Sequence, residues 1–143
     1  MLLRTTRFGD LDIDEDRLLT FDEGPMGFPA ARTFALVDVA ENEDFFWLQS
    51  TDDADLAFLG TVPWAYFPDY EPEISEEVVS RLELGSEDEP TVLCLLTIDR
   101  ERREVTANLL GPVVVNPRTR RGCQTVLYDQ DWPTAAPLGP GVV

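Results

Sequence analysis

The sequence contains no histidine and no lysine, and these absences exclude much of the chemistry that enzymes use. Without histidine there is no Ser-His or Cys-His pair to activate a nucleophile, and the commonest general acid–base group is missing. No glycine-rich phosphate loop is present either. We therefore expect no enzyme and no cofactor. A carboxylate pair like that of a glycosidase is the catalytic arrangement that the 28 acidic residues leave open.

Metal ligands are scarce as well, because the two cysteines, Cys94 and Cys123, are too few for a structural zinc site. Both lie in apolar segments, which favours buried thiols, although a disulfide between them stays open. The run Asp10–Asp14 alternates aspartate as a calcium loop does at its start. Glu15 stands where that loop needs glycine and Phe21 where it needs its bidentate acid, so no metal site is predicted.

Long apolar runs are also missing, and none approaches the roughly 20 residues of a membrane span. Met1–Thr5 shows neither the apolar region nor the cleavage site of a signal peptide, so we expect a cytoplasmic protein that does not enter membranes. The chain has 143 residues and 43% hydrophobic composition, which suit one folded domain over 1–143 without disulfide or metal staples.

What the sequence has in abundance is negative charge, with a formal net charge of −17. The charge is concentrated in residues 38–89, which hold sixteen acidic residues and Arg81 as the only base. Phosphate backbones and anionic lipids would be repelled, so no direct nucleic-acid binding is expected. A basic protein would be attracted. A solvated surface produced by biased composition, with arginine as the only base, is the alternative interpretation.

Short strand-like segments and one helix dominate the pattern. Residues 63–74 hold three prolines and four aromatics and should run extended along an edge or across the surface. A helix is predicted over 76–83, capped by Ser75 and stopped by Gly85, and a loose or surface-packed tail over 129–143. The expected strands are 2–8, 17–21, 33–39, 45–50, 57–62, 91–98, 104–110, 113–116 and 122–128, with Leu11 and Ile13 extending one of the first two. This pattern predicts a mostly β fold, a small antiparallel β-barrel or barrel-like sandwich with one short α-helix near 76–83.

Several motifs in fixed order are more specific than this fold class. They are Thr6-Arg7-Phe8-Gly9, Gly27-Phe28, Phe46-Trp47-Leu48-Gln49-Ser50, Leu56-Ala57-Phe58, Pro63, Phe67-Pro68-Asp69-Tyr70-Glu71, Thr106-Ala107-Asn108-Leu109, Pro112-Val113-Val114-Val115-Asn116 and Gln124. Together they resemble the FliW family of bacterial flagellar assembly factors from about residue 2 to 138. The departures from the family pattern, Asp22, Ala54 and Gly111, all fall in expected turns.

The resemblance implies a protein-binding regulator. Members of this family bind CsrA, a small basic RNA-binding translational repressor, and relieve its repression of flagellin mRNA, while flagellin competes as a second partner. The alternative is an acidic, chaperone-like flagellin binder without a translational role. A monomer is expected when no partner is bound.

The candidate partner-binding residues are Asp69, Tyr70, Glu71, Pro72, Asp53, Asp55, Asn108, Pro112 and Asn116. Aromatic side chains on a proline-fixed strip are favoured interface anchors. Each candidate also has a structural interpretation: residues 69–71 could form an edge, Asn108 and Asn116 could be turn or bulge residues, and Pro112 could end a strand. Trp47 and Phe58 are expected in the core, and the structural interpretation of Gln49 and Ser50 is that they satisfy buried backbone groups.

Overall fold

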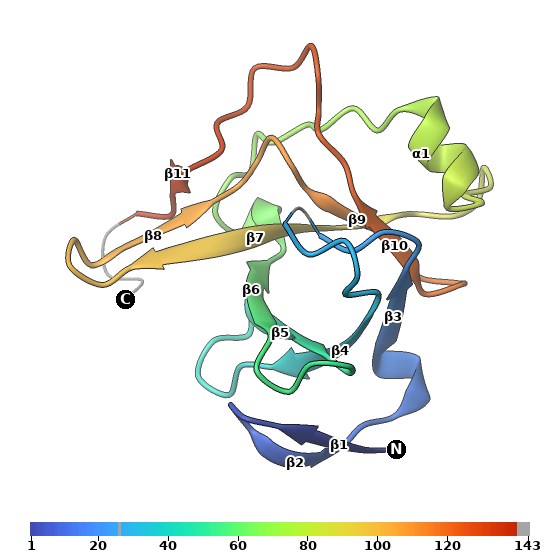
Figure 1. Ribbon diagram of the computed structural model, residues 1–143. Coiled ribbons are helices and arrows are strands. Elements are labelled where there is room, and N and C mark those ends of the chain that lie inside the picture. Colours follow the sequence, from blue (N-terminus) through green and yellow to red (C-terminus); the bar gives the residue numbers. More distant parts are fainter. Residues whose placement is uncertain (26, 140–143) are drawn as a thin grey trace.

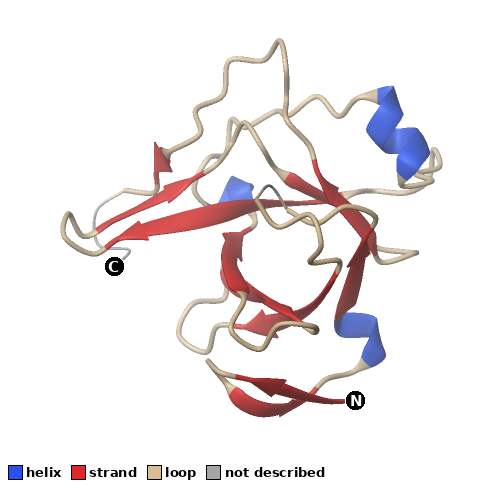
Figure 2. Ribbon diagram, in the orientation of Figure 1, coloured by secondary structure: helices blue, strands red, loops and turns tan. Residues whose placement is uncertain are grey.

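The computed structural model describes residues 1–25 and 27–139, which fold mainly into β-strands (Figure 1). The strands are β1 (Leu2–Thr5), β2 (Gly9–Asp12), β3 (Leu18–Phe21), β4 (Thr33–Asp38), β5 (Phe45–Ser50), β6 (Ala57–Thr61), β7 (Thr91–Asp99), β8 (Glu104–Ala107), β9 (Val113–Asn116), β10 (Arg121–Gln124) and β11 (Ala136–Pro137). Helix α1 spans Glu76–Arg81, and the 3-10 turns η1 and η2 span Glu15–Arg17 and Pro63–Ala65. Figure 2 shows that long loops join these short elements, with α1 at the periphery.

Within the described part of the chain, seven strands close into a barrel. The order around the ring is β7-β6-β5-β4-β3-β10-β9, and β9 pairs with β7 to complete it. The predicted small, mostly β barrel with a short helix is therefore confirmed. One pairing among the described strands departs from the expected antiparallel arrangement, because β10 runs parallel to β3. Gly122 permits this close approach, since a Cβ there would lie 3.1 Å from the Phe21 ring and 3.2 Å from the Val114 carbonyl oxygen.

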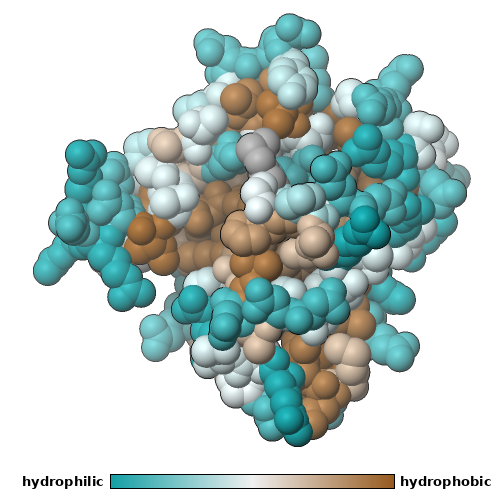
Figure 3. Space-filling view, viewed as in Figure 1, coloured by the Kyte–Doolittle hydropathy of each residue, from teal (hydrophilic) through white to brown (hydrophobic). Residues whose placement is uncertain are grey.

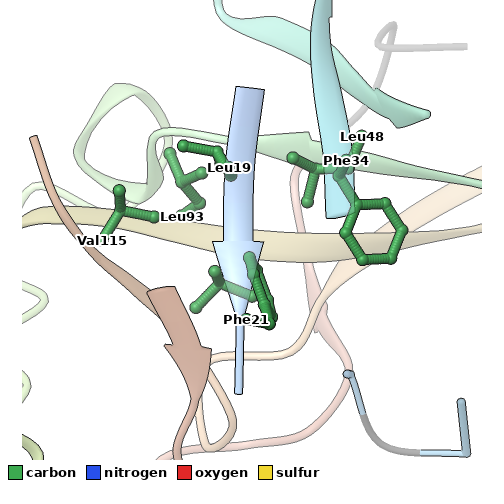
Figure 4. Packing of buried hydrophobic residues seen from close by; sticks show 7 residues of the cluster. Leu19, Phe21, Phe34, Leu48, Leu93 and Val115 are labelled. Carbon is green, nitrogen blue, oxygen red and sulfur yellow. The ribbon is translucent and has the colours of Figure 1, made fainter. Parts of the chain in front are cut away.

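Alternate residues of the barrel strands fill its interior (Figure 4). On β3, Leu19 and Phe21 are buried while Thr20 is exposed, as the two-residue period of a strand requires. The cluster formed with the facing strands consists of Leu19, Phe21, Phe34, Leu48, Leu93, Val113 and Val115. Phe21 and Phe34 pack with ring centroids 5.5 Å apart. This core makes the barrel a solid scaffold for its surface loops.

Strand β7 belongs to the barrel at one end and to a projecting hairpin at the other. Its residues 91–93 pair with β9, and its residues 96–99 pair with β8. Strand β11 adds to the far edge of β8, with Ala136 opposite Ala107. Of the two alternatives for the tail, loose or packed along the surface, residues 129–139 follow the second: Trp132 packs on Tyr70 at 4.8 Å, and the Leu109 amide donates to the Pro133 carbonyl at 3.0 Å. Residues 140–143 lie outside the described residues.

The segment that was expected to extend a neighbouring strand forms a strand of its own. β2 pairs with β1 in a separate antiparallel hairpin, with Leu11 opposite Leu3. Leu3 and Ile13 are buried against Ala35 of β4, so the hairpin packs on the outside of the barrel. At the other end of the chain, the strand expected over 122–128 ends at Gln124. The Thr125 amide still donates to the carbonyl of Pro112, the next residue in register, but proline has no amide to donate in return, so the ladder stops.

Helix α1 begins where the sequence predicts and ends earlier. The Ser75 side chain accepts a hydrogen bond from the Val78 amide and caps the first turn. Glu83, and not Gly85, adopts the left-handed conformation that ends the helix, with φ of 55°. The Leu84 amide then donates to the Val79 carbonyl, and the Glu83 amide to the Ser80 carbonyl, as in a Schellman motif.

Both cysteines are buried and free, so the open disulfide alternative is wrong and the predicted buried thiols are confirmed. Burial raises the pKa of Cys94 to about 12 and also raises the pKa of Cys123. Within residues 1–25 and 27–139, no helix has the length and apolar character needed to cross a membrane.

Candidate protein-binding surface

The acidic strip, which we define as Asp69, Glu71 and Glu73, follows η2 on the outside of the barrel. These three side chains are exposed, whereas the intervening residues point inward: Tyr70 is 2% exposed, and Pro72 is half-buried. This alternation places the carboxylates of the strip on one side of the chain and its apolar groups on the other. Asp69 and Glu71 were among the candidates predicted from the sequence, whereas Glu73 was missed; its spacing of two residues from Glu71 is the sequence signal that points to it.

Tyr70 anchors the strip to the barrel. Its hydroxyl donates to the Leu109 carbonyl oxygen at 2.6 Å, and its ring packs edge-on against Trp132 at 4.8 Å. The Trp64 indole nitrogen donates to the Tyr70 carbonyl at 2.7 Å. Burial raises the pKa of the Tyr70 hydroxyl well above its usual value. The side chain of Tyr70 therefore belongs to the core, which corrects the expectation that it stands at the surface as an interface anchor.

Two hydrogen bonds fix the far end of the acidic strip. The Glu73 amide donates to the Gln130 side-chain oxygen at 2.9 Å, and the Gln130 side-chain nitrogen donates to the Glu73 carbonyl at 3.0 Å. Because Tyr70 holds the strip near its start and Gln130 near its end, its carboxylates are presented by a backbone that is attached at both sides.

A second group of exposed carboxylates lies in the acidic turn, residues 51–55 between β5 and β6. The Ser50 hydroxyl oxygen accepts hydrogen bonds from the amides of Asp52 and Asp53 at 3.2 and 3.1 Å. The Asp55 carboxylate accepts a hydrogen bond from the Thr6 hydroxyl. Asp53 and Asp55 are thus exposed, as expected of partner-binding residues, and the turn that carries them is held from beneath.

Gln49 supports the same turn from inside. Its side-chain nitrogen lies 3.3 Å from the Asp53 carbonyl oxygen and 3.1 Å from that of Leu56. The side chain is fully buried, so its role is to satisfy backbone carbonyls, as its structural interpretation predicted. The Gln49-Ser50 motif therefore builds the acidic turn and does not itself reach the surface.

The β1–β2 hairpin covers the outer side of β5. The Arg7 guanidinium lies 4.3 Å from the centre of the Trp47 ring, and the Phe8 ring packs against the same indole at 6.0 Å. The Thr6 amide also donates to the Ala54 carbonyl at 3.0 Å. Trp47 is half-buried under these residues, and the motif 6–9 thereby positions the acidic turn.

The remaining candidates hold the fold together. The Asn108 side chain accepts from the Gly111 amide at 2.9 Å, which makes it a turn residue. Pro112 is buried, and Asn116, which is fully buried, donates to the Leu82 carbonyl at 2.9 Å. Pro112 and Asn116 therefore cannot touch a partner in this conformation, and half-buried Asn108 is occupied within its own turn.

The structure does not bring all exposed candidates together. Strand β5 begins near η2 and the acidic strip and ends at the acidic turn, so the two groups lie at opposite ends of the β5–β6 hairpin. Figure 3 shows one face of the molecule, with hydrophilic side chains over the projecting β7–β8 hairpin and over the β5–β6 turn. Hydrophobic side chains surface in the middle of this face.

Few of the acidic side chains in residues 38–89 are paired. Fifteen of the sixteen are exposed, and Asp88 is half-buried. Arg118 binds the Asp88 carboxylate at 3.1 Å, and this hydrogen bond lowers the pKa of Asp88. Ion pairs also join Arg17 to Asp38 and Arg81 to Glu77. Residues 38–89 are all described, and no other ion pair within them involves an acidic residue. No group of three potential metal ligands occurs in the described chain.

The chain is therefore a small, closed β-barrel protein with an acidic surface, and hydrogen bonds to the barrel hold the loops that carry its exposed carboxylates. The sequence model of one family of such proteins, described as FliW protein, matches residues 2–138. The chain belongs to the FliW family. It is 34% identical over 139 residues to the flagellar assembly factor FliW of Bacillus licheniformis, covering 97% of each chain. It is 38% identical over 130 residues to that of Magnetococcus marinus, covering 90% of this chain and 80% of the relative.

A solved structure shows the same architecture. The crystal structure of the flagellar assembly factor FliW aligns with this chain at a TM-score of 0.88 and 29% identity, covering 100% of both chains. The names of these relatives designate an assembly role and not a catalytic one.

Proposed function

We propose that this protein acts in flagellar assembly as a regulator that binds two proteins, the basic RNA-binding repressor CsrA and flagellin. Its relatives are named flagellar assembly factors, and the family resemblance implies these two partners. The observation that carries the proposal is the surface position of the acidic residues: fifteen of the sixteen in 38–89 are exposed. A surface of this kind attracts a basic protein and repels RNA.

The acidic strip is the proposed docking site for CsrA. Its three exposed carboxylates lie on a segment tied to the barrel by Tyr70 and Gln130, so little ordering is needed when a partner binds. Once bound, the protein would place negative charge beside the RNA-binding surface of CsrA and weaken its hold on flagellin mRNA. Flagellin competes for the protein, which works in the cytoplasm as a monomer without touching RNA or membrane.

The deciding experiment is a calorimetric titration with CsrA and with flagellin, separately and in competition, followed by a gel shift of CsrA on flagellin mRNA. We expect both proteins to bind, and CsrA to be displaced from the RNA. A protein that fails to bind CsrA, or that leaves the CsrA–RNA complex intact, would refute the regulatory role. Binding of flagellin alone would support the chaperone-like alternative.

Glu71→Arg tests the acidic strip directly. Glu71 is exposed and forms no ion pair with a described residue, so the reversal should leave folding unchanged. Binding of CsrA should weaken by about tenfold or more, because a like charge then faces the basic partner. Glu101→Arg, an equal reversal on the exposed β7–β8 tip, is the control and should weaken binding much less. Equal losses of affinity in both variants would mean that CsrA is attracted non-specifically and does not dock at the acidic strip.

A further inference from the structure

An apolar notch opens between the loop that follows β3 and the acidic turn. It encloses about 340 Å³. Phe28, Pro29, Ala31 and Leu56 form its apolar wall, and Asp52 and Asp53 line its acidic wall. Phe28 is 44% exposed, which leaves the ring accessible from the notch. This place lies on the other end of the β5–β6 hairpin from the acidic strip.

The apolar wall of the notch is held in place. The Phe28 ring packs edge-on against Phe58 of β6, with centroids 5.3 Å apart. The Ala31 amide donates to the Phe28 carbonyl at 3.0 Å. Gly24 lies so close beneath this loop that a Cβ would stand 2.1 Å from the Phe28 carbonyl oxygen, so the loop seats directly on glycine backbone. The aromatic wall is thus formed before any ligand arrives.

The acidic wall is equally fixed. Ser50 holds the amides of Asp52 and Asp53, and Gln49 holds the carbonyl of Asp53 from inside. Among the described residues, no ion pair involves either carboxylate. Asp53 Oδ1 accepts a hydrogen bond from the Asp55 amide at 3.0 Å, which leaves Asp53 Oδ2 and the Asp52 carboxylate for a cation that enters the notch.

This combination matches one kind of side chain. An aliphatic stem can lie along the apolar walls, a planar cation can stack on an aromatic face, and two carboxylates can accept its hydrogen bonds. We propose that the notch receives an arginine side chain of the basic partner protein. The inference rests on the proposed function and adds a second, separate contact to the acidic strip. It also explains why the motifs Gly27-Phe28, Gln49-Ser50 and Leu56-Ala57-Phe58 converge on one place.

The first test uses the whole protein and CsrA. The double variant Asp52→Asn/Asp53→Asn removes two charges, keeps the side-chain shapes, and retains at position 53 an oxygen that can accept the Asp55 amide. Glu87→Gln/Glu89→Gln removes the same charge from exposed residues of the loop between α1 and β7, outside both the notch and the acidic strip. We expect the notch variant to lose about tenfold or more in affinity and the control less than about twofold. Phe28→Ala should weaken binding without any change in charge. Equal losses of affinity in the two double variants would refute the proposal that the notch binds an arginine side chain.

The second test does not depend on CsrA. N-acetyl-arginine amide is titrated into the isotope-labelled protein, with N-acetyl-citrulline amide as the neutral analogue of the same shape. We expect amide shifts confined to residues 27–31 and 50–56 with arginine, and none with citrulline or in the Asp52→Asn/Asp53→Asn variant. Shifts spread over all acidic loops, or equal shifts with citrulline, would refute the notch. If the wild-type protein binds no CsrA but shows the local shifts, CsrA is not the partner, while the notch is still supported as an arginine-binding site.

Discussion

Tyr70 shows how a single side chain decides what a surface segment can do. It stands between two exposed carboxylates, yet it is 2% exposed and donates to the Leu109 carbonyl. The sequence indicated the acidic strip through its prolines and acids, but it could not reveal the direction of Tyr70. That direction depends on a carbonyl group 39 residues further along the chain, to which no local pattern points.

Tyr70→Phe should destabilise the protein by about 1–3 kcal/mol, because the buried Leu109 carbonyl loses its donor. Urea unfolding measures the change. Tyr128→Phe is the matched control, since Tyr128 is 79% exposed, and its effect should stay within about 0.5 kcal/mol.

The same pair of variants also tests the placement of Tyr70. CsrA binding should be unchanged in Tyr70→Phe, because the ring and the strip remain in place. A loss of binding without a loss of stability would show instead that the Tyr70 side chain contacts the partner.

At the scale of the elements, local sequence patterns predicted most strands correctly. They failed where contacts between residues far apart in the sequence determine the structure. Strands 45–50 and 113–116 were predicted to the residue. β2 was missed because the polar run around Leu11 becomes a strand only through pairing with β1. Similarly, the segment 129–139 carries no periodic pattern, and its order comes from contacts with Tyr70, Val105 and Leu109.

Helix α1 is too short to be stable by itself and depends on its attachment to the barrel. Asn116→Ala removes the hydrogen bond to the Leu82 carbonyl and should cost about 1–3 kcal/mol. Amide hydrogen exchange should accelerate most in residues 76–84, more than in β4 or β5. Ser75→Ala, which removes only the helix cap, should cost about 1 kcal/mol and serves as comparison. Uniformly faster exchange in Asn116→Ala would contradict a local attachment.

At the scale of the whole molecule, the raised pKa values of two buried groups, Cys94 and Tyr70, make the free energy of unfolding fall at alkaline pH. The unfolded Cys94 thiol titrates near 9.0, whereas in the folded protein its pKa is about 12. The folded state therefore holds the proton longer, and its contribution to stability is full below pH 9 and lost as the pH rises to about 12. Tyr70 acts in the same direction above its ordinary value of 10.0.

Urea unfolding under reducing conditions should thus show a free energy of unfolding that falls steadily above pH 9. Cys94→Ala should be less stable at neutral pH but show a shallower alkaline decline. An equally steep decline in the variant would exclude Cys94 as the cause.

The net charge of −17 predicts opposite effects of salt on folding and on binding. Between about 50 and 300 mM salt, screening should raise the free energy of unfolding, because repulsion among the carboxylates falls. Affinity for the basic partner should fall over the same range. Calorimetry and urea unfolding in matched buffers measure both. An affinity independent of salt would mean that residues 38–89 are only a solvated surface.

The parallel pairing of β3 with β10 also sets the order in which the molecule can be completed during synthesis. β3 to β7 can pair as they leave the ribosome, but the ring stays open until β9 and β10, which end at Gln124, have been made. Until then the free edges of β3 and β7 expose unpaired backbone groups, which invite aggregation. A chain released before residue 121 would carry every carboxylate of 38–89 without a closed barrel to arrange them. Completion of the last barrel strand, and not the appearance of the charge, gives the nascent protein a defined binding surface.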